Sequence, residues 1–255
     1  DAQESRGLGD VYKRQIDNIT RGDILNTNFE QFYVYGGYGN NAIFNGISVT
    51  KSGSDWGYTP TQYWADGTWN FAGYAGGDGV NASWENSTGV LTLTVNSDAS
   101  HQSDVVYAHL KDIEVNDAST YNTPVSLAFN HLLSKVQFKF TKEVASLGGV
   151  NVTLQNFSVS GITTNAKWVD GTQNVADPSQ EGSYGDFSAA TEIDGMDGLS
   201  TIAYYIVPQQ VEAFAISAEA VVTDANGAEI KSGNVTATVP TAVITEWEAQ
   251  KSYIY

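Results

Sequence analysis

Residues 213–230 read AFAISAEAVVTDANGAEI, and this stretch decides the fold class. Apolar side chains occupy every second position from Phe214 to Val222, which is the period of a β-strand with one buried face. The alternation stops at residues 224–227 (DANG) and then resumes in residues 228–239. Asn-Gly between two alternating runs is a strong signal for a β-hairpin. The stretch therefore predicts two antiparallel strands joined by a turn.

The same two-residue period recurs along most of the chain. Leu91, Leu93 and Val95 alternate with threonines, as expected for a half-buried strand. Further strands are expected in residues 32–34, 43–49, 105–115, 150–160 and 201–207. No stretch shows the pattern of an amphipathic helix of three turns. Short strands separated by turns every 8–12 residues or so are typical of sandwiches and barrels, so the sequence predicts an all-β protein.

A change of phase in the middle of the chain indicates two domains. Apolar residues occupy odd positions in residues 125–129 and even positions in residues 136–140. One flat strand cannot bury both sets, so a bulge or a break is expected near residues 131–135. The segment NDASTYNT, residues 116–123, reads as a linker. We therefore expect sandwich domains at residues 16–122 and 123–255.

Residues 1–15 differ in pattern from the rest of the chain. They hold three of the twelve basic residues, Arg6, Lys13 and Arg14, and show no strand alternation. We interpret this segment as a non-native or disordered tail. Any signal peptide or lipid-anchor cysteine is expected upstream of it.

Charge and composition exclude several functions. The net charge of −17 makes nucleic acid and anionic membrane surfaces poor partners. The absence of cysteine excludes disulfides, thiolate zinc sites and a cysteine nucleophile. No apolar run approaches the ~20 residues that span a bilayer. We expect neither a cofactor nor a metal ion.

Candidate catalytic residues form no recognisable constellation. The chain contains no GxSxG motif, and His131, beside the phase break, is better explained as a structural histidine. A glycosidase needs two carboxylates at a defined separation, and the loop-bound acids give no such pair. The acidic segment 170–198 favours a solvated loop over a calcium site. We therefore interpret the chain as non-enzymatic.

An aromatic-rich segment, residues 56–84, holds four of the six tryptophans: Trp56, Trp64, Trp69 and Trp84. Two interpretations stay open for these rings. They can fill the core of the first sandwich, which we favour because aromatic side chains dominate core burial. Alternatively, exposed flat rings can stack on sugars and form a glycan-binding platform.

Several landmarks together resemble the fimbrillin family of Bacteroidales pili. In chain order they are Thr20-Arg21-Gly22-Asp23, Trp56-Gly57-Tyr58-Thr59-Pro60, Gln62-Tyr63-Trp64, residues 71–74 (FAGY), residues 125–136 (VSLAFNHLLSKV), residues 205–210 (YIVPQQ) and Trp247 with residues 251–255 (KSYIY). Each is weak alone, but their order is specific, and the resemblance covers about residues 16–255.

The resemblance implies exported lipoproteins with two tandem transthyretin-like β-sandwich domains, located in fimbriae at the outer membrane. In polymerising members an arginine-specific protease removes the first strand, and a strand from a neighbour fills the groove by β-strand addition. Arg21, just before the first clear strand, is the candidate processing site. The partners implied are other fimbrial subunits, and host or bacterial surface glycans or proteins.

The resemblance leaves two functions open. The first is a structural or accessory subunit of a surface fimbria; the alternative is a non-polymerising adhesin or glycan-binding module on the same scaffold. Polymerising members carry further strand-forming sequence at the C-terminus, whereas this sequence stops at Tyr255, inside its apparent last strand. A shortened chain, a terminal subunit and a non-polymerising surface protein all fit that feature.

Overall fold

The structure is a computed structural model that describes residues 28–116, 124–142, 149–176, 179–193, 195, 197–239 and 244–255. Within these residues every helix or strand element is a β-strand, so the all-β prediction is confirmed. The chain forms two compact units. The first takes its described residues from 1–96, 103–132 and 166–176, and the second from 97–102, 133–165 and 177–255. The tail of residues 1–15 lies outside the described part, as does the predicted linker of residues 116–123 apart from Asn116, so the boundary at 122/123 stays a prediction.

A six-stranded antiparallel sheet forms the larger layer of the first unit, in the order β3-β2-β1-β4-β7-β8. Its strands are β1 (Gln31–Tyr38), β2 (Asn41–Ser52), β3 (Asp55–Gly57), β4 (Gly67–Gly76), β7 (Val105–Val115) and β8 (Asn130–His131). Val34 packs on one face of the sheet and Tyr35 on the other, and both are buried. Both faces of this sheet are therefore covered.

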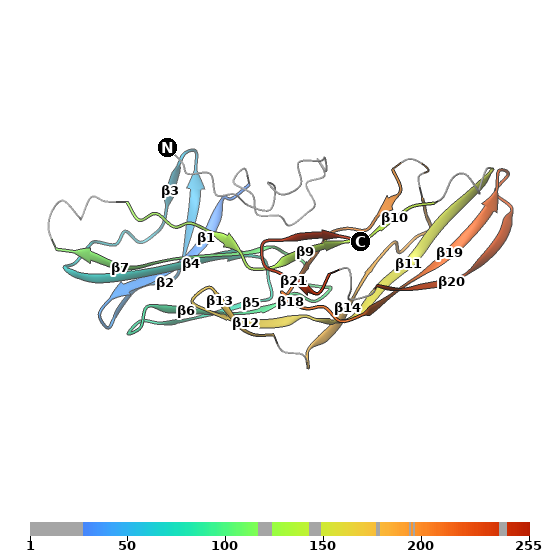
Figure 1. Ribbon diagram of the computed structural model, residues 1–255. Coiled ribbons are helices and arrows are strands. Elements are labelled where there is room, and N and C mark those ends of the chain that lie inside the picture. Colours follow the sequence, from blue (N-terminus) through green and yellow to red (C-terminus); the bar gives the residue numbers. More distant parts are fainter. Residues whose placement is uncertain are drawn as a thin grey trace. The chain divides into compact units, whose positions relative to one another are not determined.

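A four-stranded sheet, in the order β13-β12-β6-β5, covers the face that carries Tyr35 (Figure 1). Its strands are β5 (Val80–Glu85), β6 (Val90–Asn96), β12 (Asn165–Val169) and β13 (Thr172–Ala176). The alternating apolar residues of β6 fill the space between the sheets. Among them, Leu91 and Leu93 are both 0% exposed. Trp84 of β5 packs there against Tyr35. Strands β12 and β13 come from much later in the chain than their neighbour β6.

Irregular segments cover the opposite face of the six-stranded sheet. Its buried cluster includes Trp69 and Phe71, and Trp64, Val125 and Leu127 pack against this cluster. Residues 125–129, whose apolar residues occupy odd positions, form no ladder. Their side chains do alternate in burial, since the segment lies across a sheet face instead of beside a strand edge.

The second unit is built around a five-stranded sheet, in the order β14-β11-β19-β20 with β15 also on β11. Its strands are β11 (Val150–Thr163), β14 (Glu181–Asp186), β15 (Thr191–Glu192), β19 (Phe214–Asp224) and β20 (Glu229–Val239). The smaller sheets use β9 (Ser134–Gln137), β10 (Lys139–Phe140), β16 (Leu199–Ser200), β17 (Tyr204–Ile206), β18 (Gln209–Gln210), β21 (Glu246–Trp247) and β22 (Ser252–Ile254). An aromatic core that includes Phe138, Phe157 and Trp247 lies within this unit.

The predicted phase break is confirmed. Strand β8 ends at His131 and pairs with β7, whereas β9 begins at Ser134 and pairs with β17 and β22. The backbone N–H of Leu132 still donates to a carbonyl in the first unit, and Leu133 belongs to the second. The change of phase therefore marks the point where the chain passes from one unit to the other.

The hairpin predicted from residues 213–239 is also confirmed. Strands β19 and β20 pair antiparallel from Phe214↔Val239 to Thr223↔Glu229. Asp224 closes the turn by accepting hydrogen bonds from the backbone N–H groups of Asn226 and Ala228, each at 2.8 Å. Gly227 adopts φ +84°, a conformation that glycine takes without a steric cost.

Candidate functional site

The four tryptophans of residues 56–84 lie in different environments. Trp69 is buried, at 1% exposed, and its indole N–H donates to a backbone carbonyl at 2.9 Å. Trp64 is half-buried and packs edge-on against Trp69. Trp84 is half-buried between the two sheets, near Tyr35. Of the four, Trp56 is the exposed one, at 40%, so the rings do not form one exposed row. The stacking role considered for Trp56, Trp64, Trp69 and Trp84 stays a prediction.

Trp56 is held in place by Phe29, which precedes β1, and by residues on β1 and β2. It lies on β3, which returns along β2 after a turn at Gly53, whose φ is +64°. Its ring centroid lies 5.4 Å from that of Phe29 and 5.3 Å from that of Phe32. The Nζ atom of Lys51 lies 5.8 Å from the ring centroid, within the range of a cation–π contact. The ring is thus packed on one side and partly open to solvent.

The loop of residues 58–66 presents two further aromatic rings. Tyr58 is 38% exposed and packs edge-on against Phe44, with centroids 5.3 Å apart. Tyr63 is 83% exposed, while the next residue, Trp64, packs into the first unit. Sequence reasoning used Tyr63 as a landmark of the family and missed it as a site residue. The sequence signal for its exposure is its position directly before Trp64, because neighbouring residues of an extended chain point to opposite sides.

A groove of about 290 Å³ lies in the first unit where β1 begins. Strand β1 pairs with β2 from Gln31 onward but with β4 only from Tyr33 onward, so β1 and β4 diverge at this end. The last residues of β4, Ala75 and Gly76, pair with β7 and with no described strand on their other side. Residues 28–31, 75–77 and 103–104 line the groove. Backbone from two diverging strands therefore meets solvent there.

A buried contact between an aspartate and a histidine lies at the wall of the groove. Asp104 is 1% exposed, and its Oδ2 atom lies 2.7 Å from Nδ1 of His131. The pair joins the start of β7 to β8, because Asp104 directly precedes Val105 and His131 ends β8. A carboxylate this deeply buried needs such a partner. The contact fits the structural role expected for His131.

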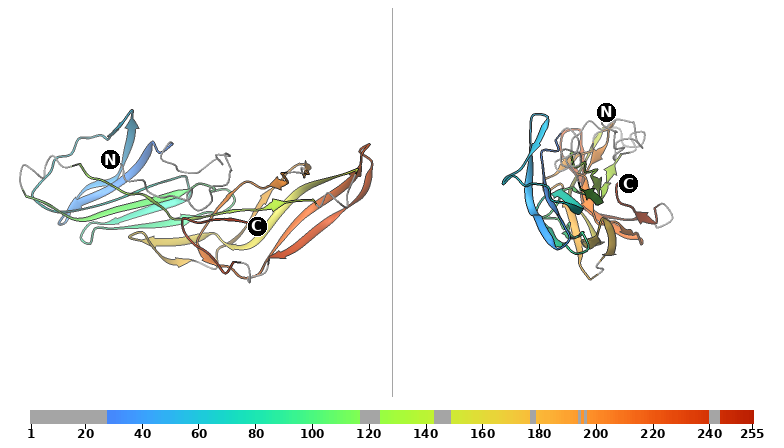
Figure 2. Two further views of the ribbon diagram at one scale, coloured as in Figure 1. Left: turned by 45° about the horizontal axis from the view of Figure 1, so that its top comes forward. Right: turned by 90° about the vertical axis from the view of Figure 1, so that its left-hand side faces the viewer.

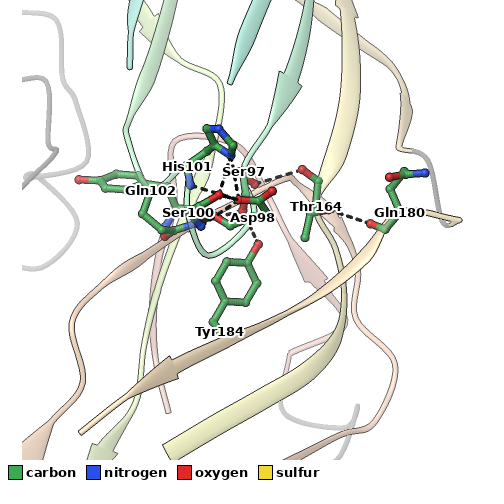
Figure 3. A network of polar contacts seen from close by, with 9 residues as sticks. Ser97, Asp98, Ser100, His101, Gln102, Thr164, Gln180 and Tyr184 are labelled. Carbon is green, nitrogen blue, oxygen red and sulfur yellow. Dashed lines mark hydrogen bonds and ion pairs between the residues drawn. The ribbon is translucent and has the colours of Figure 1, made fainter. Parts of the chain in front are cut away.

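Figure 3 shows a polar network in the second unit around residues 97–102. The carboxylate of Asp98 accepts a hydrogen bond from the backbone N–H of Ser100 at 2.8 Å and lies 2.8 Å from Nδ1 of His101. The hydroxyl of Ser100 lies 3.1 Å from the same Nδ1 atom. In a Ser-His-Asp triad the acid and the hydroxyl bind opposite ring nitrogens. This set is therefore a turn and not a catalytic triad.

The same network fixes its segment to the rest of the second unit. The Tyr184 hydroxyl donates to the carbonyl of Ser97 at 2.6 Å, and burial raises the pKa of Tyr184 above its ordinary value. The amide of Gln102 donates to the carbonyl of Tyr205 at 3.2 Å and accepts from that residue's N–H at 2.8 Å. Through the backbone carbonyl of Ser97 and the side-chain amide of Gln102, these contacts tie the segment to Tyr184 and Tyr205.

Two acidic residues of 170–198, Asp170 and Asp186, make separate structural contacts. Asp170 accepts a hydrogen bond from the Tyr107 hydroxyl and pairs with Lys111. Asp186 accepts from the backbone N–H of Ile202 at 2.6 Å. Over the described ranges, no group of three or more His, Asp or Glu side chains is arranged to hold a metal ion. Asp177 and Asp194 lie outside the described residues.

Arg21, the predicted processing site, also lies outside the described residues, whose first member is Asn28. Its cleavage stays a prediction. Among the described residues, no helix is long and apolar enough to cross a bilayer.

Comparison with known proteins identifies the family. The sequence pattern of the fimbrillin-like family matches residues 22–255. The chain belongs to this family. No match was found among curated protein sequences.

Two solved structures share the fold. A fimbrial protein from Bacteroides vulgatus is 15% identical, with a TM-score of 0.63 over 88% of this chain and 86% of that one. A candidate cell adhesion protein from Bacteroides ovatus is 16% identical, with a TM-score of 0.51 over 89% of this chain and 80% of that one. At such identities the likeness concerns the fold alone.

Membership of the fimbrillin-like family gives the chain a fimbrial or adhesin-type role in a cell-surface appendage. The family is structural in character, which agrees with the non-enzymatic interpretation of the sequence.

Proposed function

We propose that the chain is a structural or accessory subunit of a bacterial surface fimbria and that it joins its neighbours by β-strand addition. The observation that best supports this is the groove between β1 and β4. Ala75 and Gly76 of β4 have a described ladder partner only in β7, so their other side can accept an incoming strand. Main-chain hydrogen bonds would supply affinity, and alternate side chains would set the register.

The surroundings of the groove suit an extended backbone. Gly76 and Gly77 line it, and a Cβ atom on Gly77 would lie 2.2 Å from Oγ of Ser103, so a side chain there would need a rearrangement. Buried Asp104, paired with His131, keeps one wall in place. On this proposal the subunit is exported as a lipoprotein, its two units are transthyretin-like sandwiches, and it functions at the outer membrane.

The arginine content of the chain makes the processing step easy to test. Its arginines are Arg6, Arg14 and Arg21, so within this sequence an arginine-specific protease cannot cut beyond residue 21. The full gene product would be treated with such a protease, and amide hydrogen exchange would be followed in residues 74–77 before and after treatment. We expect protection of these amides to rise as subunits join, because a new strand would pair with them.

The matched control is Arg21→Gln, which leaves Arg6 and Arg14 as the remaining cutting sites of this sequence. This variant should show no gain of protection after protease treatment. Equal protection in the variant and the natural chain, or none in either, would count against processing at Arg21 followed by strand addition.

A second candidate function is adhesion to a glycan through the exposed rings. Trp56, Tyr58 and Tyr63 are the exposed large aromatic residues among those described, and all lie in residues 56–63. Aromatic rings stack on the apolar faces of sugars, and the tyrosine hydroxyls add polar contacts. A glycan array would test this. Trp56→Ala and Tyr63→Ala should abolish any binding found, whereas Ile202→Ala, at another exposed apolar residue, should not.

A further inference from the structure

Strand β20 is an open sheet edge of unusual length. It spans Glu229–Val239, and every residue from Glu229 to Thr238 is exposed. Val235 is 48% exposed although it lies opposite Ala218, which is buried. Strand β19 pairs with one side of β20, and no described strand pairs with the other. Figures 1 and 2 show the hairpin, orange to red, at the margin of its sheet.

Beyond Glu229 and Lys231 at its start, the sequence of this edge lacks the usual protection against pairing. Natural edge strands carry charges, prolines or bulges that keep other strands away. Residues 232–239 read SGNVTATV, with no charged residue and no proline. The register shift in the hairpin lies at Val222/Thr223, away from this stretch. At the other end of the sheet, β14 has carboxylates at both of its ends, Glu181 and Asp186.

The edge is also complementary to itself. We propose that β20 pairs antiparallel with β20 of a second copy of this chain, about a two-fold axis at Val235. A two-fold axis perpendicular to the sheet keeps like faces together, so residue pairs must share parity. The pairs are then Val235 with Val235, Asn234 with Thr236, Gly233 with Ala237 and Ser232 with Thr238.

These pairs place compatible side chains opposite each other. The polar face brings Ser232 beside Thr238 and Asn234 beside Thr236, where hydroxyl and amide groups can exchange hydrogen bonds. The other face carries the small or β-branched residues Gly233, Val235 and Ala237, which lie opposite the apolar residues of β19 in the ladder. Lys231 falls opposite Val239, so no charge faces a charge within the paired stretch.

These compatible residue pairs are the reason to propose a second copy of the chain as the partner of the β20 edge. Residues 232–238 carry no charge, so pairing this stretch with its own copy places no charged side chain in the new ladder. The chain's net charge of −17 opposes association, but salt at physiological strength screens charges beyond about 8 Å. One strand pair buries little surface compared with a standard interface, so the dimer should be reversible and depend on concentration.

The absence of cysteine makes the register directly testable. In a Val235→Cys variant the two new thiols would lie opposite each other at the two-fold axis. In the control Lys231→Cys, residue 231 pairs with 239, so the two thiols would lie about 27 Å apart at about 3.4 Å per residue. Mild oxidation should give mostly disulfide-linked dimer for Val235→Cys and mostly monomer for Lys231→Cys.

A second measurement addresses association without a covalent trap. Sedimentation equilibrium of the intact, untreated chain should show dimer that grows with concentration. Val235→Lys should remain monomeric, because it would place two ammonium groups opposite each other, while circular dichroism confirms that the strands persist. The proposal fails if the natural chain stays monomeric throughout, or if Lys231→Cys crosslinks as readily as Val235→Cys. Neither test involves proteolysis, so the result is independent of the proposed fimbrial assembly.

Discussion

The hydroxyl of Tyr107 donates a hydrogen bond to Oδ1 of Asp170 at 3.1 Å, although 63 residues separate the two in sequence. Tyr107 lies on β7 in the six-stranded sheet, and Asp170 lies in the turn between β12 and β13. Lys111 binds the other carboxylate oxygen of Asp170. This contact ties a hairpin from late in the chain to the earlier sheet within the first unit.

Removing that hydroxyl should weaken the first unit. Tyr107→Phe deletes the donor and keeps the ring, so we expect the free energy of unfolding to fall by about 1 kcal/mol, the usual size of such a hydrogen bond. Urea denaturation would measure the change. Tyr63→Phe removes a hydroxyl from an 83% exposed side chain and should leave the midpoint unchanged. Equal effects of the two variants would contradict the role assigned to Asp170.

Trp69 should matter far more to stability than Trp56. Trp69 is 1% exposed and stacks on Phe71 with centroids 5.6 Å apart, so Trp69→Ala should cost about 3–5 kcal/mol by leaving a cavity. Trp56 is 40% exposed, and Trp56→Ala should cost much less. Thermal unfolding followed by circular dichroism would compare them. A similar loss in both variants would show that Trp56 belongs to the core.

Alkaline pH should destabilise the chain partly through Tyr74. Burial, followed by the nearby Tyr35 and Tyr33, raises the pKa of Tyr74 to about 12. The folded state therefore holds this proton at pH values where the unfolded chain, with a tyrosine pKa near 10, has lost it. The stability contributed by Tyr74 is complete below about pH 10 and disappears as the pH rises towards 12. Denaturant midpoints should fall less steeply over this range in Tyr74→Phe than in the natural chain.

The turn of the β19–β20 hairpin should respond to acid. Hydrogen bonds from the backbone N–H groups of Ala228 and Asn226 lower the pKa of Asp224. A lowered pKa means that the stabilising contribution is present above the ordinary pKa of 3.8 and is lost as the pH falls through the folded-state value. Hydrogen exchange of β20 amides should therefore speed up in acid relative to Asp224→Asn, which keeps the oxygen acceptor but cannot titrate.

Sequence patterns predict where the strands of this protein lie better than they predict which strands pair with each other. The hairpin of β19 and β20 was predictable because alternation and an Asn-Gly turn are both local features. The pairing of β12 with β6 was not, since alternation assigns faces and says nothing about which strands meet. Residues 125–129 show that alternation does not always mean a strand in a sheet. Their side chains alternate in burial because the segment packs across a sheet face, although it forms no strand ladder.

The candidate surfaces were less predictable than the fold. Four tryptophans in one segment suggested a shared environment, yet exposure separates Trp56 from Trp69, because burial depends on the tertiary position of each ring. The exposure of Tyr63, at 83%, was evident only from the structure. The groove at the start of β1 was likewise hidden, since it arises where β1 and β4 diverge, and divergence of two strands leaves no mark in either sequence.

Assembly after proteolysis tests the central claim most directly. Static light scattering would follow the natural chain and Arg21→Gln, each treated with an arginine-specific protease. If the chain is a fimbrial subunit that polymerises by strand addition, the molar mass of the natural chain should rise steadily after treatment as filaments form. The molar mass of the variant should stay low. A natural chain that is cut cleanly after Arg21 yet stays a monomer would contradict the account.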